Sequence, residues 1–275
     1  MLVLQGGELL RYEDICTRLK EAGIDNYKQE AGILIEELCP PFSYDLDYDS
    51  EALLAAVNKR CERYPLQYII GKWWFARCEF EVGEDCLVPR PDTELIVELA
   101  EKMLPRDACF ADLCTGSGCI AVSILDMRSD THADAYELYP KTLDIAVRNA
   151  ERNKVSDRLC TILADVLKPD ALGDRKYHAI ISNPPYIRTE VIDTLESEVK
   201  SEPRAALDGG DDGLVFYRAI VKNFAKNLED DGFFIFEIGY DQGNDLKRIA
   251  EENGFSCEIK KDLGGCDRAA ILRRK

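Results

Sequence analysis

The sequence has only two histidines, His132 and His178, and none of its eleven cysteines forms a CxxC pair. A zinc site needs such ligands at close spacing, and a disulfide framework needs cysteines in a regular pattern in a small secreted chain. The sequence therefore predicts neither a metal site nor a disulfide framework. Four cysteines lie within or beside apolar runs and are interpreted as buried thiols of a reducing cytosol: Cys109, Cys119, Cys160 and Cys257.

Long apolar runs are also missing. No stretch reaches the 18 or more apolar residues, roughly, that a membrane-spanning helix needs. The N-terminal MLVLQGGELLRYED has a short apolar stretch and no basic region before it, so no secretory signal is expected. These observations predict a cytoplasmic protein without a membrane anchor.

Positive charge is scarce, because 35 Lys and Arg stand against 52 Asp and Glu, giving a formal net charge of −17. Binding to phosphate backbones depends on clustered Lys and Arg. The composition therefore argues against a chain that clamps nucleic acid, and no direct nucleic-acid partner is expected. An acidic, solvated surface is the simplest interpretation.

The 275 residues suffice for one large domain and a smaller one, and 46% hydrophobic residues suffice for a sizeable core. Residues 1–70 contain three segments with apolar residues at helical spacing, separated by Gly23 and by Pro40-Pro41. Ser50 is the expected N-cap of the third helix. Residues 71–90 alternate in part and are rich in aromatic residues, which indicates a β-hairpin linker.

From residue 91 to 275 strand and helix patterns alternate. A buried strand is expected in ACFADLC and further strands in HADAYEL, LCTILAD, HAIISN and GFFIFEI, with helices between them, and SCEIKKDL and AAILRR close the chain as a strand pair. Such alternation predicts an α/β domain with a mostly parallel sheet that helices cover on both faces.

The ends of the first three strands carry residues suited to a nucleoside. The first strand runs into a glycine-rich turn, Cys114-Thr115-Gly116-Ser117-Gly118, which would let a ligand approach the backbone at a helix N-terminus. A tight turn without a ligand is the alternative. Glu137 ends the second strand, where it can accept hydrogen bonds from ribose hydroxyls, and Asp165 follows the third. Together they favour a nucleoside-bearing cofactor in the crevice at this edge of the sheet.

The fourth strand runs into Asn183-Pro184-Pro185-Tyr186. This tetrapeptide resembles the (D/N/S)PP(Y/F/W) signature of methyltransferases that modify amide or exocyclic amine nitrogens, which implies S-adenosylmethionine as cofactor and S-adenosylhomocysteine as product. An amide nitrogen is a poor nucleophile because its lone pair is delocalised. If Asn183 Oδ1 and the Pro184 carbonyl each accept one N–H, the nitrogen is held for in-line transfer, and the rigid prolines fix both acceptors in advance. Tyr186 can cover the planar group.

Three further segments resemble one family over nearly the whole chain, the protein-(glutamine-N5) methyltransferases that act on peptide chain release factors. They are PRPDTE (89–94), the long segment EVKSEPRAALDGGDDGLVFYRAI (198–220) and FEIGYDQG (236–243). The resemblance implies a class I methyltransferase fold, which is Rossmann-like with a seven-stranded, mostly parallel sheet, behind a small all-α domain that recognises the substrate. It also implies methyl transfer to the glutamine N5 in the GGQ motif of a release factor.

Residue by residue, the resemblance places the cofactor on Cys114, Thr115, Gly116, Ser117 and Gly118. It places Glu137 on the ribose, Asp165 and Val166 at the adenine, Asn183 between cofactor and substrate, and Asn183 to Tyr186 on the glutamine amide. Two departures from the family stand out. Cys114 replaces a glycine that is usual there, and only its backbone is expected to matter. Val166 stands where the family can have an aromatic residue that stacks on adenine.

PRPDTE also has a structural interpretation, in which Asp92 or Thr93 caps the next helix and Glu94 lies in its first turn. Arg90 is a candidate contact to cofactor or substrate. The turn residues expected in the long segment are Asp208, Gly209, Gly210 and Asp212.

Three alternatives to release-factor methylation remain open at this stage. The first is glutamine methylation on a ribosomal protein, which uses the same local chemistry. The second is adenine-N6 methylation of nucleic acid, against which the charge of −17 counts. The third is a non-catalytic nucleoside-binding or assembly module.

Overall fold

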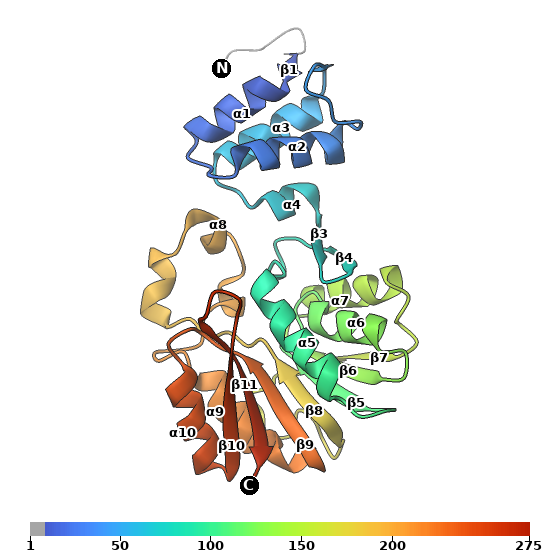
Figure 1. The fold of residues 1–275 in the computed structure, drawn as a ribbon, viewed down its shortest axis with the longest axis vertical. Helices are drawn as coiled ribbons and strands as arrows, with labels where there is room; N and C mark the ends of the chain where they lie inside the picture. The colour runs from blue at the N-terminus through green and yellow to red at the C-terminus, as the bar shows by residue number, and fades with distance from the viewer. Residues whose placement is uncertain (1–8) are drawn as a thin grey trace. The chain divides into compact units, whose positions relative to one another are not determined.

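The computed structural model describes residues 9–275, so the N-terminal expectation of no secretory signal rests partly on residues outside it. The chain divides into two compact units (Figure 1). The first comprises Met1–Lys72 together with Glu196–Ser201, and the second comprises Trp73–Leu195 with Glu202–Lys275. No sequence pattern indicates that residues 196–201, which follow the NPPY segment, join the N-terminal unit.

Helices make up most of the N-terminal unit. They are α1 (Tyr12–Glu21), α2 (Tyr27–Leu38), α3 (Glu51–Cys61) and α4 (Leu66–Ile70), with a short antiparallel pair β1 (Leu10–Arg11) and β2 (Asp47–Tyr48). The first three pack on one another through apolar faces spaced as the sequence predicts. Ser50 Oγ accepts the Leu53 N–H at 3.2 Å, which confirms the expected cap of α3.

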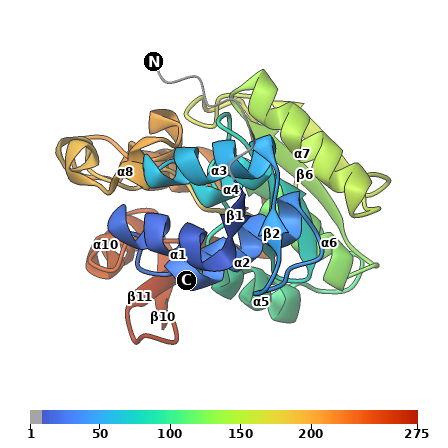
Figure 2. The same ribbon diagram turned by 90° about the horizontal axis from the view of Figure 1, so that it is seen from above.

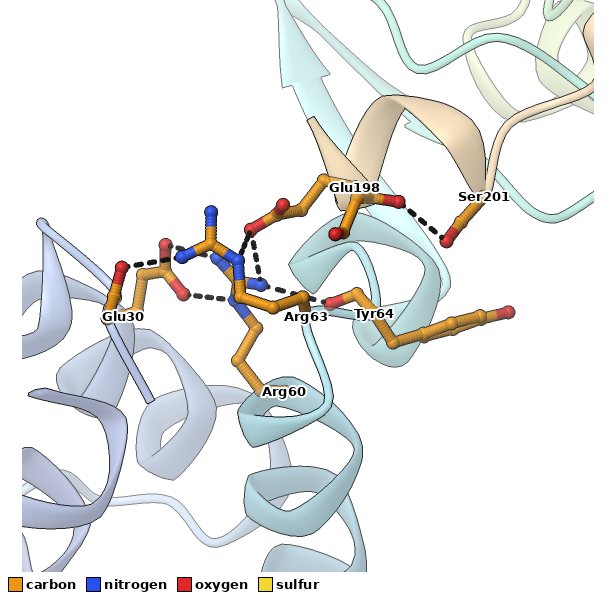
Figure 3. A network of polar contacts seen from close by, with 8 residues as sticks. Glu30, Arg60, Arg63, Tyr64, Glu198 and Ser201 are labelled. Carbon is orange, nitrogen blue, oxygen red and sulfur yellow. Dashed lines mark hydrogen bonds and ion pairs between the residues drawn. The ribbon is translucent and has the colours of Figure 1, made fainter. Parts of the chain in front are cut away.

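A buried arginine ties residues 196–201 to this unit (Figure 3). Arg60 is 5% exposed, and its guanidinium contacts Glu30 at 2.5 Å, Glu198 at 3.0 Å and the Tyr64 carbonyl at 3.3 Å. Arg63 reaches the same Glu198 carboxylate at 2.8 Å. A buried guanidinium needs such partners, since an unpaired charge is costly there. The network therefore holds the short helix α8 (Ser197–Lys200) against the N-terminal helices.

The second unit is built on a seven-stranded sheet in the order β10-β11-β9-β8-β5-β6-β7. The strands β5 to β9 pair in parallel, and β11 pairs antiparallel with both β9 and β10. This confirms the expected class I fold and the closing strand pair. The strand bounds are β5 (Cys109–Leu113), β6 (His132–Glu137), β7 (Leu159–Leu163), β8 (Tyr177–Ser182), β9 (Leu228–Glu237), β10 (Phe255–Lys261) and β11 (Asp267–Arg274).

Helices cover both faces of this sheet. On one face lie α5 (Glu94–Met103), α6 (Cys119–Met127) and α7 (Pro140–Arg152), and on the other lie α9 (Val215–Phe224) and α10 (Gly243–Glu252), as Figure 1 shows. Figure 2 keeps the same separation, with α10 opposite α6 and α7. The core between β8, β9 and α9 includes Phe234, Phe236 and Tyr217, whose rings stack or meet edge to face. Short 3-10 helices complete the unit: η1 (Pro91–Thr93), η2 (Thr189–Thr194), η3 (Arg204–Ala206) and η4 (Ala225–Asn227).

A β-hairpin of β3 (Lys72–Phe75) and β4 (Cys78–Glu81) lies where the sequence predicts one. Its second strand is bonded to α7, because Asn149 Oδ1 accepts the Glu81 N–H at 2.6 Å and Asn149 Nδ2 donates to the Glu81 and Ser117 carbonyls at 3.0 and 2.9 Å. A single buried amide thus joins the hairpin to the glycine-rich turn.

The expectation of buried thiols is wrong for Cys160, which is exposed. Cys160 lies on β7, one of the two edge strands of the sheet, where neighbours cover less of the strand than they cover at the centre. Cys109, Cys119 and Cys257 are partly buried. In the part of the chain that the structure describes, no helix is long and apolar enough to cross a membrane.

Candidate active site

The candidate residues gather at the carboxyl ends of the parallel strands. The chain passes from β5 to its neighbour β6, while β8 lies on the other side of β5, so the strand order reverses at β5. Ligands of open α/β sheets bind outside the strand ends at such a reversal. The turn after β5, Glu137 at the end of β6, Asp165 after β7 and Asn183 after β8 all meet there.

The turn after β5 is organised by a buried carboxylate. Asp112 is fully buried, and its Oδ2 accepts the Thr115 hydroxyl at 2.6 Å and the Ala121 N–H at 3.2 Å. Burial raises the pKa of Asp112 to about 7. Asp112 Oδ1 and Ser117 Oγ are buried and make no hydrogen bond within residues 9–275. The Thr115 hydroxyl is thus directed to Asp112, while its N–H donates to the Tyr136 carbonyl at 3.0 Å and its carbonyl accepts the Gly118 N–H at 2.9 Å.

Left-handed backbone shapes this turn. Gly116 has φ +57° and Gly118 has φ +80°, and Cys114 has φ +60°, a conformation that favours glycine. The position that is usually glycine in the family thus keeps a glycine-like backbone although it carries a side chain. Burial raises the pKa of the Cys114 thiol, which keeps it protonated and unsuited to nucleophilic chemistry.

Gly118 has a packing role. A Cβ at Gly118 would lie 3.3 Å from Ala146 Cβ on α7, and Gly118 does not line the cavities described below. Its expected contact with a cofactor therefore stays a prediction from the resemblance.

Glu137 lies at the end of β6 and is held by the backbone. Its Oε1 accepts the Leu138 and Tyr139 N–H groups at 2.8 and 3.2 Å, and its Oε2 accepts the Gly116 N–H at 3.0 Å. Each carboxylate oxygen has two lone-pair directions, so acceptor capacity remains for the hydroxyls of a ligand. The bond to Gly116 also links the ends of β5 and β6.

Asp165 and Val166 lie in the turn beyond β7, which ends at Leu163. Asp165 Oδ1 accepts the Leu167 N–H at 2.9 Å, while Val166 is 5% exposed. Both line the same cavity as Glu137. An apolar surface from Val166 and Leu167 thus stands beside a carboxylate, where a planar base could lie.

Two adjoining cavities occupy this edge of the sheet. The larger is an open cleft of about 790 Å³, a volume that includes solvent at its mouth. The smaller, of about 340 Å³, lies between the glycine-rich turn and residues 87–93. Both are lined by Leu87, Cys114, Gly116 and Asn183, so they meet at the NPPY segment.

Asn183 begins the NPPY segment one residue after β8. Its Nδ2 donates to Thr93 Oγ1 at 3.3 Å. No hydrogen bond from residues 9–275 reaches Asn183 Oδ1 or the Pro184 carbonyl. Pro184 and Pro185 are buried, and Pro185 joins Asn183 in lining the larger cavity. Two consecutive residues of a rigid segment therefore each carry an acceptor that has no donor from the described chain.

A buried carboxylate on β9 accepts hydrogen bonds from this segment and from Thr93. Glu237 is 2% exposed, and it accepts the Thr93 hydroxyl at 2.5 Å on Oε2 and the Tyr186 hydroxyl at 3.3 Å on Oε1. Burial raises the pKa of Glu237 to about 7 and also raises the pKa of Tyr186. The expected capping of α5 by a side chain is wrong for Thr93. The turn η1 precedes the helix, and the Thr93 hydroxyl is directed to Glu237 instead.

The backbone after the two prolines is held by Gln242. Gln242 Nε2 donates to the Tyr186 and Gly213 carbonyls at 3.1 Å each, and Gln242 Oε1 accepts the Gly239 N–H at 2.9 Å. A Cβ on Gly213 would overlap the Tyr186 carbonyl oxygen, and one on Gly209 would lie 2.7 Å from Tyr186 Cα. These glycines therefore allow the long segment to approach the NPPY backbone closely.

The long segment also contacts residues 88–90. Glu202 is buried, accepts the Val88 N–H at 2.9 Å and pairs with the Arg90 guanidinium. Arg90 lines the smaller cavity, so this ion pair fixes one of its walls. The next residues, Pro203, Ala205 and Ala206, line the larger cavity.

The structure brings the predicted site residues together at one edge of the sheet, although Gly118, Pro184 and Tyr186 do not line the cavities. Sequence reasoning missed Leu87 and Phe216, which line the larger cavity, because single apolar residues carry no motif. It identified the segments of Thr93, Glu237 and Gln242 but gave these residues no role in the site. The available signal was an acid and an amide, Glu237 and Gln242, within FEIGYDQG, because polar groups that become buried need hydrogen-bond partners.

Known proteins are similar to this chain in sequence and in fold. Residues 91–228 match the family model described as Methyltransferase small domain. The chain is 36% identical over 261 residues to the release factor glutamine methyltransferase of Geobacter sulfurreducens, covering 91% of this chain and 90% of the relative. It is 33% identical to that of Thermodesulfovibrio yellowstonii, covering 95% and 91%.

The chain belongs to the release factor glutamine methyltransferase family. Among solved structures, the ribosomal protein L11 methylase from Lactobacillus delbrueckii subsp. bulgaricus is similar with a TM-score of 0.51 and 20% identity, covering 70% of this chain and 84% of that one. At that identity the likeness concerns the fold alone. Membership confirms the resemblance inferred from PRPDTE, NPPY and FEIGYDQG.

Proposed function

We propose that this enzyme transfers a methyl group from S-adenosylmethionine to the side-chain amide nitrogen of the glutamine in the GGQ motif of a peptide chain release factor. The observation that carries the proposal is the adjacent pair of acceptors, Asn183 Oδ1 and the Pro184 carbonyl, which no donor of residues 9–275 reaches, in a member of this family. The substrate is a translation factor, so the cytoplasm is the compartment we propose.

The residues at the strand ends fit the cofactor. Glu137 keeps acceptor capacity for ribose hydroxyls, Val166 offers an apolar surface for adenine beside Asp165, and Ser117 Oγ is buried without a partner among the described residues. The smaller cavity at the glycine-rich turn would take the amino-acid end. When bound, S-adenosylmethionine supplies an electrophilic methyl carbon on a sulfonium.

The chain's own contribution is to orient the acceptor nitrogen. Asn183 Oδ1 and the Pro184 carbonyl each accept one N–H of the substrate carboxamide, which turns the nitrogen lone pair toward the cavity. The methyl carbon that the bound cofactor would supply would form a bond to this nitrogen as its carbon–sulfur bond breaks, with the electron pair left on the sulfur of S-adenosylhomocysteine. The nitrogen then releases one proton to water. The substrate nitrogen itself attacks the methyl carbon, so no thiol nucleophile takes part, and the protonated Cys114 is not suited to be one.

Substitution of Asn183 by alanine tests this assignment. Asn183→Ala should lower methyl transfer by roughly a hundredfold or more, since one of the two acceptors is gone, with the fold intact by circular dichroism. The assay incubates the enzyme with labelled S-adenosylmethionine and, separately, with release factor, ribosomal subunits and DNA. Label on the release factor glutamine supports the proposal. Label confined to ribosomal protein or to DNA, or wild-type turnover by Asn183→Ala, refutes it.

A further inference from the structure

The Asn183 carboxamide can face the cavity with either end, and only one end suits an amide substrate. With Oδ1 outward it accepts a substrate N–H, whereas with Nδ2 outward two donors would oppose each other. The inward end meets Thr93 Oγ1 at 3.3 Å. A hydroxyl can donate or accept, so Thr93 alone does not fix the orientation.

Glu237 removes this ambiguity. The Thr93 hydroxyl lies 2.5 Å from Glu237 Oε2, and an ionised carboxylate only accepts hydrogen bonds. The single hydroxyl hydrogen of Thr93 is then directed to Glu237, and Thr93 Oγ1 must accept from Asn183. The inward end of the carboxamide is therefore Nδ2. Thr93 is 1% exposed and Glu237 is 2% exposed, so no bulk water competes for these bonds.

We propose that Thr93 and Glu237 are positioning residues that act in series, with the ionised Glu237 carboxylate orienting the Thr93 hydroxyl so that Asn183 presents Oδ1 to the substrate amide. This inference rests on the proposed function for the identity of the substrate. Glu237 lines neither cavity and Thr93 lines only the smaller one, and both act through Asn183.

Protonation of Glu237 exchanges donor and acceptor in the hydrogen bonds between Glu237, Thr93 and Asn183. A carboxyl proton on Oε2 is donated to Thr93 Oγ1 across the short contact, and the Thr93 hydrogen becomes available to Asn183. Asn183 then accepts through Oδ1 and turns Nδ2 toward the cavity. The unproductive orientation thus belongs to the protonated acid, and activity should be lost as pH falls.

The surroundings of Glu237 place this change near neutral pH. Burial raises its pKa to about 7, against the lowering effects of the Thr93 bond, of the Arg268 cation on β11 and of the Tyr186 bond. Asp92 in η1 raises it further. The other titratable groups facing it are Tyr217 on α9 and Cys119 on α6. Burial raises the pKa of both and keeps them neutral, so neither alters the direction of the effect.

Two threonine variants and one control test the series. Thr93→Val removes the hydroxyl with little change of shape and should lower kcat at least tenfold, while the Kd of S-adenosylmethionine measured by calorimetry changes less than twofold. Thr93→Ser keeps the hydroxyl and should restore kcat to within threefold of wild type. Thr131→Val is the matched control, because Thr131 is also buried and its hydroxyl donates to the Arg128 carbonyl away from the site. It should leave kcat unchanged.

The pH profile distinguishes positioning from a merely structural effect. Wild-type kcat should fall below about pH 7, and the remaining kcat of Thr93→Val and of Glu237→Gln should show no such limb. In Glu237→Gln the amide nitrogen faces Thr93 and mimics the protonated acid, so its kcat should be low at every pH. A wild-type limb that persists in both variants would overturn the proposal.

A measurement without substrate separates this inference from the proposed function. In the ligand-free protein, the side-chain amide ¹⁵N resonance of Asn183, assigned by its absence in Asn183→Ala, should titrate near pH 7. It should not titrate in Thr93→Val or in Glu237→Gln. If wild type methylates no release factor but the resonance titrates, the proposed function fails and the series stands. If wild type is active and the resonance does not respond to pH, the series is refuted alone.

Discussion

Asparagine in place of Asp112 should make the enzyme more stable at alkaline pH. Asp112 is fully buried, and burial raises its pKa from 3.8 to about 7, although Thr115 and Ala121 donate to it. A raised carboxyl pKa means that the folded state favours the protonated acid. The stability that this group contributes is therefore fully present below pH 3.8 and is lost as pH rises through about 7.

The size of the effect follows from the two pKa values. The rise of the pKa from 3.8 to about 7 corresponds to about 4 kcal/mol over the whole window, of which about 2–3 kcal/mol falls between pH 5 and pH 8. An asparagine side chain at this position would keep an oxygen for Thr115 and Ala121 and has no charge to desolvate. The free energy of unfolding of Asp112→Asn should therefore rise relative to wild type by about 2–3 kcal/mol between these pH values.

Urea denaturation followed by far-ultraviolet circular dichroism at pH 5, 6, 7 and 8 measures this difference. Asp231→Asn, at an exposed position on β9, is the matched control and should show a difference that does not vary with pH. A constant difference between Asp112→Asn and wild type across the four pH values would show that Asp112 is ionised in the folded protein throughout. The inference that burial raises the pKa of Asp112 to about 7 would then be wrong.

Two other substitutions test the cofactor site and the N-terminal unit. Glu137→Ala should weaken S-adenosylmethionine binding by roughly 1–3 kcal/mol because charge-assisted bonds to the ribose are lost, and unchanged affinity by calorimetry would remove Glu137 from the site. Arg60→Ala should lower the stability of the N-terminal unit by about 3 kcal/mol, since Glu30 is left without a cation in a largely buried place. Arg11→Ala, which breaks an exposed pair with Asp47, should leave the urea midpoint unchanged. Equal effects of the two arginine variants would contradict the interpretation of the buried network.

Much of this architecture could be predicted from periodicity. Strand and helix patterns alternate cleanly after residue 91, and each strand ends in a residue that stands out from its apolar run, so the sheet and its functional edge follow from sequence alone. The three N-terminal helices and the Ser50 cap follow in the same way. These features depend on local sequence, which is why they can be predicted locally.

The remaining features depend on contacts between distant residues. Nothing near Glu198 in the sequence indicates that it pairs with Arg60, and nothing near Thr93 indicates that Glu237, rather than the next helix, takes its hydroxyl. The apolar neighbours of Cys160 predict a buried thiol, but burial there depends on the strand's place at the sheet edge. Sequence patterns describe one face of an element and do not show what lies opposite.

Three segments that the sequence shows as separate motifs form one hydrogen-bonded unit in the structure. Thr93 from PRPDTE and Glu237 from FEIGYDQG hold the Asn183 side chain and the Tyr186 hydroxyl, while Gln242 holds the Tyr186 carbonyl. This unit contains two acceptors, Asn183 Oδ1 beside the cavity and the Pro184 carbonyl, that no donor of residues 9–275 reaches. A glutamine amide matches that pair, whereas a glutamate carboxylate would place its own oxygens against two others and leave all of them unpaired. Since a polar group buried without a partner costs about 1–3 kcal/mol, the bonds that we propose to orient the nitrogen would also reject the acid.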